Sequence, residues 1–438
     1  MIPIIYSILE RRSRLITMEK LASIQPGMNP ELEKIYYQTD TCVRCGRCTA
    51  VCPTYKATRK ETMSARGRIF LARKYLEGSL PLSKTFALYN DLCLGCQACL
   101  EVCPPKIETD RLISLIKQDI IDKQGIPLDS KIMLKICSHP QAFHWIVKLL
   151  DFNKKAGIVH LLPHEFQSRA NMFPAASSKT FLEIIRAEPV KTGGGKLKVG
   201  YYPGCLTNAL YPELGLAVIK VLQQHGCDVV VPKETVCCGL PHKAGGEHGE
   251  HRRLARKNIE FFFGQDVDYI VTNCGTCTRA FKEYIDIFEH DAQMAAKARQ
   301  FVEKSRDIME FLTDIAGLTV GSKSMGGIRV TYHESCHLNR GLRVFKQPRK
   351  ILESLPGAKF IEMPRANWCC GGAGSFSFKH PDTARKILRQ KMGDLQSTEA
   401  QVITAGCQGC MMQLSYGTRE FGVKCIVKHP IELLALTY

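Results

Sequence analysis

Long apolar runs are missing from this sequence. No stretch approaches the roughly 20 consecutive apolar residues that span a bilayer, although 45% of the 438 residues are hydrophobic. The apolar start, residues 1–9, is short, and charges follow it, whereas a secretory signal has the opposite order. We therefore expect a cytoplasmic chain. Residues 1–35 are expected to form a helical N-terminal arm, which is either an exposed extension or a contact to a partner subunit or to the inner face of the membrane.

The sequence also lacks a nucleotide-binding fingerprint. Its 34 glycines include no Gly-x-Gly-x-x-Gly between a predicted strand and a helix, and the glycine-rich stretch 371–374 directly follows two cysteines. No carboxylate–histidine pair has a spacing recognisable for proton abstraction, so we assign no catalytic residue. No zinc finger, helix-turn-helix or RNA-binding signature accompanies the formal charge of +18. These absences argue against a self-sufficient dehydrogenase and against a nucleic-acid partner.

Cysteine is abundant instead, with 21 residues. Residues 42–53 and 93–104 are two copies of Cys-x2-Cys-x2-Cys-x3-Cys-Pro, the ferredoxin signature for cubane [4Fe–4S] clusters, in which the fourth cysteine binds the other cluster. Three thiolates two residues apart can wrap one face of a cluster through a tight loop. Two structural zinc sites are the alternative, although zinc needs neither the third cysteine nor the Cys-Pro. We assign one cluster to Cys42, Cys45, Cys48 and Cys103, and the other to Cys93, Cys96, Cys99 and Cys52.

The segments around these two runs are predicted to be helical. Apolar residues follow helical spacing after each run, and about 40 residues separate the runs, which is too many for a compact β-rich ferredoxin. We therefore predict an all-helical two-cluster ferredoxin domain over residues 36–125. Residues 126–196 carry no cysteine pattern and read as a helical connector that ends in a glycine-rich linker. The expected helices are 61–78, 82–92, 108–124, 131–151 and 179–187, the last two within segments broken by prolines.

Beyond the linker the cysteines repeat. A single cysteine is followed after 31 or 32 residues by Cys-Cys-Gly, and after a further 35 or 36 residues by Cys-x2-Cys. Strand and helix segments alternate between them, so we predict two duplicated parallel α/β domains, 197–320 and 321–438, with the cysteines at carboxyl ends of strands. The fold class is thus α+β and multidomain. The expected strands are 198–202, 228–231, 269–272, 329–332, 359–362 and 401–404, and the expected helices are 213–225, 248–263, 347–355 and 381–395.

Each repeat gathers five cysteines, one more than a cubane or a tetrahedral zinc site requires. We interpret each set as ligands of an iron–sulfur centre, which gives one or two further [4Fe–4S] clusters, non-cubane among the options. Zinc and a redox-inert thiol cluster are the alternatives. A four-thiolate cubane carries a charge of roughly −2, so clusters would offset part of the basic excess. The sets are Cys205, Cys237, Cys238, Cys274 and Cys277, and Cys336, Cys369, Cys370, Cys407 and Cys410; Cys137, Cys227 and Cys425 are expected to pack as small apolar residues.

The order of these motifs resembles the iron–sulfur subunit of the glycolate oxidase and D-lactate dehydrogenase type. It is also similar to the D subunit of heterodisulfide reductase, the C subunit of anaerobic glycerol-3-phosphate dehydrogenase and lactate-utilisation iron–sulfur proteins. Ala65 stands where the family often has proline, and both final Cys-x2-Cys motifs are complete, as in heterodisulfide reductases with non-cubane clusters. The resemblance rests on Cys52-Pro-Thr-Tyr55, Arg66-Gly-Arg-Ile69, Leu92–Cys99, His333–Leu338 and Cys369–Gly374.

This resemblance implies an electron-transfer subunit that is not catalytic alone. It would accept electrons from an FAD-binding subunit that oxidises glycolate or lactate, and pass them to a quinone-linked membrane component, an electron-transfer flavoprotein or another acceptor. The alternative is a heterodisulfide-reductase-like subunit in which a Cys-Cys-Gly cluster reduces a disulfide; a zinc-stabilised basic module binding nucleic acid is a third reading. Arg44, Arg47 and Lys56 are candidates for tuning a cluster or docking a partner, with solvated surface charge as the alternative.

Overall fold

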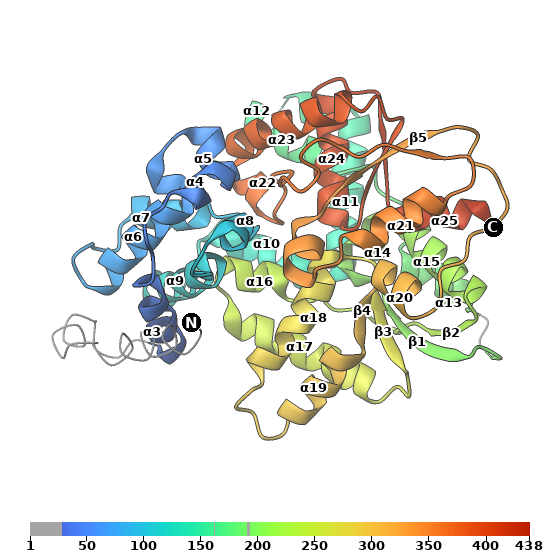
Figure 1. Ribbon diagram of the computed structural model, residues 1–438, viewed down its shortest axis with the longest axis horizontal. Helices are drawn as coiled ribbons and strands as arrows, with labels where there is room; N and C mark the ends of the chain where they lie inside the picture. Colours follow the sequence, from blue (N-terminus) through green and yellow to red (C-terminus); the bar gives the residue numbers. More distant parts are fainter. Residues whose placement is uncertain (1–28, 162, 191–192) are drawn as a thin grey trace, which may run out of the picture.

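The computed structural model describes residues 29–161, 163–190 and 193–438 (Figure 1). Most of the expected N-terminal arm lies outside these residues. The described part of the chain is a mixture of helices and two small parallel sheets, with the N-terminal helices gathered at one end of the molecule (Figure 1). None of the described helices alone has the length and apolar composition to cross a membrane; only the bent pair Gly204–Leu210 and Pro212–Gln224 meets that test together.

The two ferredoxin runs lie in a helical part of the chain, and the described residues 29–124 contain no strand. Each run carries a short helix, α4 or α8, beginning just before its third cysteine. Long helices α6 and α9 support both runs through a core that includes Ile69, Tyr75, Leu112 and Ile116. The elements are α3 (Pro30–Thr39), α4 (Arg47–Val51), α5 (Pro53–Thr58), η1 (Glu61–Met63), α6 (Ala65–Leu76), α7 (Lys84–Asp91), α8 (Ala98–Val102) and α9 (Thr109–Gln124).

The connecting segment is also helical. The expected helix over 131–151 is divided at Pro140, because proline has no N–H to continue the helical ladder and restricts the residue before it. Phe181 of α13 is fully buried and packs against Gly215, so the end of this segment joins the core of the first sheet. The elements are α10 (Leu128–Ser138), α11 (Pro140–Lys155), η2 (Ile158–Leu161), α12 (His164–Met172) and α13 (Phe181–Ala187).

Two four-stranded parallel sheets follow, with equivalent strand orders, β2-β1-β3-β4 and β6-β5-β7-β8. Six strands correspond to predicted ones, and the edge strands β4 and β8 were missed because three residues are too few to show a periodic pattern. The strands are β1 (Leu197–Tyr202), β2 (Cys227–Val230), β3 (Tyr269–Thr272), β4 (Ser305–Asp307), β5 (Arg329–His333), β6 (Lys359–Phe360), β7 (Val402–Ala405) and β8 (Ile426–Lys428).

Helices cover the sheets, and helices of one repeat pack against those of the other, as α15 does against α25 and α20 against α21. Buried residues of both sheets, including Val199 and Val330, share one hydrophobic core. Several helices were not predicted from the sequence, among them α18 and α24, which begin directly after a cysteine. The helices are α14 (Gly204–Leu210), α15 (Pro212–Gln224), α16 (Leu240–Gly245), α17 (His248–Phe263), α18 (Gly275–Ile287), α19 (Ala295–Lys304), α20 (Ile308–Asp314), the π-helix η3 (His337–Gly341), α21 (Lys346–Ser354), α22 (Phe376–Lys379), α23 (Pro381–Gln396), α24 (Gln408–Glu420) and α25 (Pro430–Thr437).

Candidate iron–sulfur centres

The first ferredoxin run forms a loop whose cysteines turn toward one pocket. The second and fourth residues after the first cysteine, Arg44 and Gly46, have left-handed backbone angles, and the second run repeats this at Gly95 and Gln97. These left-handed residues turn the backbone sharply within each loop. Among the residues that line the pocket are the four cysteines assigned to one cluster, Cys42, Cys45, Cys48 and Cys103.

The fourth cysteine of each run lies beside the other run. Cys103 comes from the second run and lines the pocket of the first. Cys52 comes from the first run and lies close enough to Cys99 of the second run to affect its thiol. Burial is the main cause that raises the pKa of Cys99, and the nearby Cys93 and Cys52 thiols add to the rise. This arrangement has the form that crossed ligation requires, while which sulfur binds which metal stays a prediction.

A buried arginine connects the two ferredoxin runs. Arg68 is 2% exposed and donates hydrogen bonds to the carbonyl oxygens of Met63 (2.6 Å) and Leu92 (2.8 Å). Arg68 thereby links Leu92, the residue before Cys93, to Met63, whose carbonyl oxygen lies 3.4 Å from the Cys52 sulfur. Its other partners are a carbonyl and a hydroxyl oxygen rather than a carboxylate. A buried cation held in this way suits an anionic centre nearby.

The first Cys-Cys-Gly set lies at the carboxyl ends of β1 and β3 and in the loop after β2. Side-chain contacts run along the set from Cys205 to Cys237, then to Cys238, then to Cys277 and finally to Cys274. Asn258 and Tyr284 fix the backbone of the cysteine pair: Nδ2 of Asn258 donates to the carbonyl of residue 237, and the Tyr284 hydroxyl donates to that of residue 238. Five sulfurs are thus held together inside the fold.

The second set is arranged in the same way but in a more positive environment. Contacts run along this set from Cys336 to Cys369, then to Cys370, then to Cys410 and finally to Cys407. Lys391 is 1% exposed, and its ammonium donates to the carbonyl oxygens of residues 365 (2.7 Å) and 366 (3.2 Å). Burial is the main cause that lowers the pKa of Lys391, to about 8. In the first repeat the neutral Asn258 occupies the corresponding part of α17.

The two Cys-Cys-Gly sets meet each other. The sulfur atoms of Cys274 and Cys407 lie 3.8 Å apart, and the Gly275 amide donates to the carbonyl of Gly406 (3.0 Å). Both glycines are required here, since a Cβ on either would lie 2.4 Å from the side chain of Leu338. The repeats therefore touch each other where their cysteines lie.

The second ferredoxin run meets the second set. Contact with Cys336 lowers the thiol pKa of Cys369, but Cys370 and burial outweigh it, and Cys96 adds to the rise. Burial is the main cause that raises the pKa of Cys96, and Cys336 adds to it. These cysteines also share a hydrophobic cluster with Phe376 and Ile387. The cysteine groups thus form one continuous row. It runs from the first ferredoxin run to the second, then to the Cys336 set, and finally to the Cys205 set.

Arg340 lies at the junction between the second ferredoxin run and the second set. It belongs to the π-helix η3, a rare element that often occurs at functional sites. Its guanidinium donates to the Glu101 carboxylate (2.8 Å) and to the Asn367 carbonyl (2.9 Å), and its Nη1 lies 3.5 Å from the Cys96 carbonyl oxygen. The sequence gave no sign of the contacts with Glu101 and Cys96, because these residues lie more than 200 positions from Arg340.

The donor groups fit iron–sulfur clusters. Burial and neighbouring thiols raise the pKa of Cys205, Cys336 and Cys96, so these thiols would not ionise at neutral pH without a cation to bind them. Thiolate is the ligand that such clusters use, and metal coordination deprotonates it. The buried cations Arg68 and Lys391 compensate negative charge at the same places.

Two residues near the cysteines were missed in the sequence. Cys137, expected to pack as an apolar residue, lies close enough to Cys205 to be affected by it: burial is the main cause that raises the Cys137 pKa to about 12, and the Cys205 thiol adds to the rise. His333 lies beside Cys370 and Cys410. Neither has a motif spacing that would mark it. Cys227 is buried in the core of the first sheet, as expected, and Cys425 is half-buried.

Comparisons with known proteins agree with these centres. A 4Fe-4S dicluster domain matches residues 38–107, and a cysteine-rich domain matches residues 199–282 and 330–415. The probable glycolate oxidase iron-sulfur subunit of Bacillus subtilis is 31% identical over 90% of this chain and 92% of its own length. The glycolate oxidase iron-sulfur subunit of Escherichia coli is 29% identical over 90% of this chain and 92% of its own length.

A second kind of relative is shorter. Lactate utilization protein A of Oceanobacillus iheyensis is 34% identical over 54% of this chain and 96% of its own length. The two full-length matches cover both the ferredoxin runs and the paired cysteine sets in one order. The chain therefore belongs to the family of glycolate oxidase iron–sulfur subunits, and it is an iron–sulfur electron-transfer protein of an oxidoreductase complex.

Proposed function

We propose that this chain transfers electrons within a flavin-dependent 2-hydroxyacid dehydrogenase complex that oxidises glycolate or lactate. FAD would be bound by a partner subunit, and a quinone, an electron-transfer flavoprotein or another carrier would accept the electrons. The observation that carries the proposal is the continuous row of cysteine groups, from the exposed Cys45 to the buried Cys274. Clusters bound there would supply one-electron steps between the two-electron chemistry of the flavin and the acceptor.

We further propose two crossed cubane clusters in a helical ferredoxin domain (36–125), and one [4Fe–4S] centre in each of two duplicated domains (197–320 and 321–438). The two cysteine-rich matches and the two sheets of equivalent strand order support the duplication. The five sulfurs of each set and their mutual contacts support a centre in each copy.

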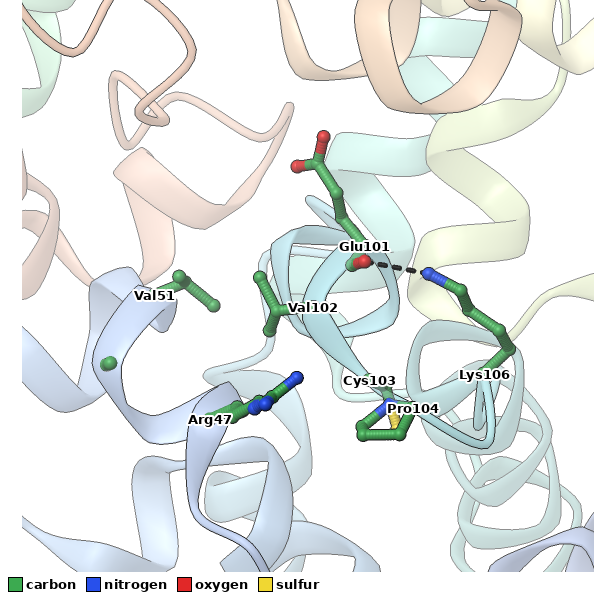
Figure 2. A pocket seen from close by; sticks show the side chains of 8 residues that line it. Arg47, Val51, Glu101, Val102, Cys103, Pro104 and Lys106 are labelled. Carbon is green, nitrogen blue, oxygen red and sulfur yellow. Dashed lines mark hydrogen bonds between the residues drawn. The ribbon is translucent and has the colours of Figure 1, made fainter.

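The ferredoxin end offers a place for a redox partner to dock. A cleft of about 520 Å³ opens beside the first pocket, and Cys103 lines both (Figure 2). Its walls carry the exposed cations Arg47 and Lys106 and the apolar Val51 and Val102. A partner with an acidic, partly apolar surface would bring its own cofactor near the cluster end of the row. Lys56 has a different role, since its ammonium lies 3.5 Å above the ring of Trp368.

Disulfide reduction by a Cys-Cys-Gly centre is the weaker candidate. It requires substrate access to the sulfurs, yet Cys237, Cys238, Cys274 and Cys277 are each at most 7% exposed. The contacts among the sets instead extend toward the ferredoxin runs, which suits electron relay.

We propose a cytoplasmic location with peripheral binding to an anionic membrane surface. Helix α11 presents Trp145, Leu149 and Phe152, which are 69%, 62% and 66% exposed, at helical spacing on one face. Exposed Lys131 and Lys135 of α10 and the half-buried Lys148 lie on the same pair of packed helices. Apolar and basic side chains together suit anionic lipid headgroups.

Vesicle sedimentation tests this location. Wild-type protein should bind vesicles that contain phosphatidylglycerol more strongly than pure phosphatidylcholine vesicles. The double variant W145E/F152E should lose at least tenfold in binding. Phe263→Glu, which changes a 51% exposed phenylalanine on α17, serves as the control and should bind as the wild type does. Equal binding by the double variant and the control would contradict the proposal.

The electron-transfer function is tested by reduction of the purified chain under anaerobic conditions. The isolated chain should be reduced by dithionite but not by glycolate or lactate. Addition of the flavoprotein dehydrogenase subunit should allow the hydroxyacid to reduce the clusters and an artificial dye. Substantial hydroxyacid oxidation by the isolated chain would refute the proposal.

A further inference from the structure

The two repeats differ at the end of their first strand. Strand β1 ends in Tyr202 and strand β5 ends in His333, each three residues before the first cysteine of its set. The Tyr202 hydroxyl has its own partner, since it donates to the carbonyl of Val236 (2.5 Å). His333 therefore corresponds to Tyr202, whose side chain in the first repeat bonds to the backbone rather than to a metal.

His333 is buried beside two sulfurs of the second set. Its side chain is 1% exposed, and Nδ1 has no hydrogen-bond partner among the described residues. The ligand atoms of His333, Cys370 and Cys410 all lie within 4.8 Å of one another. Within the described part of the chain this is the only group of three such side chains so closely placed.

An unpaired, buried ring nitrogen is unfavourable unless a ligand satisfies it. The available partners are thiolates and whatever those thiolates bind, because Cys370 and Cys410 belong to the five-cysteine set. Neutral imidazole nitrogen is an established ligand of iron, and it can replace cysteine on one iron of an iron–sulfur cluster.

We propose that His333 is a ligand of the iron–sulfur centre in the second Cys-Cys-Gly set, which makes that centre a mixed cysteine–histidine one. This rests on the proposed function only in requiring that the set binds iron. The first centre, with Tyr202 at this position, has cysteine ligands alone.

A direct consequence concerns the order of potentials. A neutral ligand in place of a thiolate leaves the centre less negative, which raises its reduction potential. The buried cations Lys391 and Arg340 act in the same direction, whereas the first repeat has Asn258 where the second has Lys391. Of the two Cys-Cys-Gly centres, the second is therefore reduced first.

Pulsed EPR of the intact, anaerobically purified protein tests the ligand directly. Protein grown with ¹⁵N-histidine and partly reduced should show a strong nitrogen hyperfine coupling on one centre, with the isotope change that identifies histidine. The variant His333→Tyr, which copies the residue of the first repeat, should keep its iron but lose this coupling and shift the potential of that centre downward. His333→Cys, a second variant, should lose the coupling as well.

His337→Gln is the matched control. His337 is a half-buried histidine next to this set, but its Nδ1 is 3.0 Å from the Thr276 hydroxyl, so the coupling should persist in this variant. Labelled wild-type protein without a directly bound nitrogen would overturn the inference, as would a coupling that survives in both His333 variants. Failure of the proposed function is distinguished by iron content: too little iron overturns the centres themselves, whereas full iron without bound nitrogen overturns His333 alone.

Discussion

Removal of the Arg340 charge should lower the reduction potential of the centres on either side of it. The side chain is 6% exposed, and its charge interacts with the thiols of both Cys96 and Cys336. At a separation on the order of 6 Å and an effective dielectric constant of roughly 20, one positive charge stabilises one added electron by about 3 kcal/mol. For a one-electron couple this corresponds to roughly 120 mV.

Methionine is the chosen substitute, because it has a similar length and leaves no cavity of the size that alanine would. EPR-monitored redox titration of Arg340→Met should show a midpoint about 120 mV lower for at least one centre. Arg340→Lys keeps the charge but loses the forked hydrogen bonds, so its potentials should stay near those of the wild type while its stability falls. The control Arg385→Gln removes a 47% exposed charge that pairs with Glu420.

This reasoning is refuted if Arg340→Met shifts no midpoint by more than Arg385→Gln does. It is also refuted if Arg340→Lys shifts the potentials as far as methionine, because the hydrogen bonds and not the charge would then be responsible.

Three further predictions concern the ferredoxin ligands, an ion-pair network within the first repeat and the contact between the repeats. Cys52→Ala should remove the EPR signal of the cluster assigned to Cys93, Cys96 and Cys99; loss of the Cys42 cluster instead would contradict crossed ligation. Burial raises the pKa of Glu283, but Lys243 and Arg279 outweigh it and lower the pKa to about 2, so Glu283→Gln should cost up to roughly 3 kcal/mol in urea unfolding at pH 7. This carboxylate stabilises the fold above its unfolded pKa of about 4.3 and loses that contribution as pH falls toward 2, so the variant and the wild type should converge below pH 4; a constant difference there would refute the ion pair. Gly275→Ala, whose Cβ would lie 2.4 Å from Leu338, should destabilise the protein by ~1–3 kcal/mol in the same assay, whereas Gly393→Ala, with open space around it, should not.

Features set by local sequence could be predicted well. The strands leading to Cys205 and Cys336 were expected because apolar runs precede each cysteine, and the structure has β1 and β5 there. The helical character of residues 61–78 followed from 3.6-residue spacing, and α6 covers most of that range. These patterns depend on residues close together in the chain, so a single sequence is enough to recognise them.

Features set by tertiary contact could not be predicted. The 3.8 Å approach of Cys274 and Cys407 joins residues 133 positions apart, and nothing in either repeat indicates that the two sets face each other. The same holds for Arg340 beside Cys96, and for His333, which stands in a strand of buried residues and looks like a core side chain. The sequence shows that residue 391 is a lysine, but not that its charge is buried beside the second cysteine set.

Iron, acid-labile sulfide and zinc content of anaerobically purified protein test the central claim most directly. Two ferredoxin clusters and two further centres predict about 16 iron and about 16 sulfide atoms per chain, with a brown colour that dithionite bleaches and only trace zinc. A value near 8 iron atoms would keep the ferredoxin clusters and remove the centres from both Cys-Cys-Gly sets. About 4 iron atoms or fewer, with stoichiometric zinc, would contradict the account of the chain as an iron–sulfur electron relay.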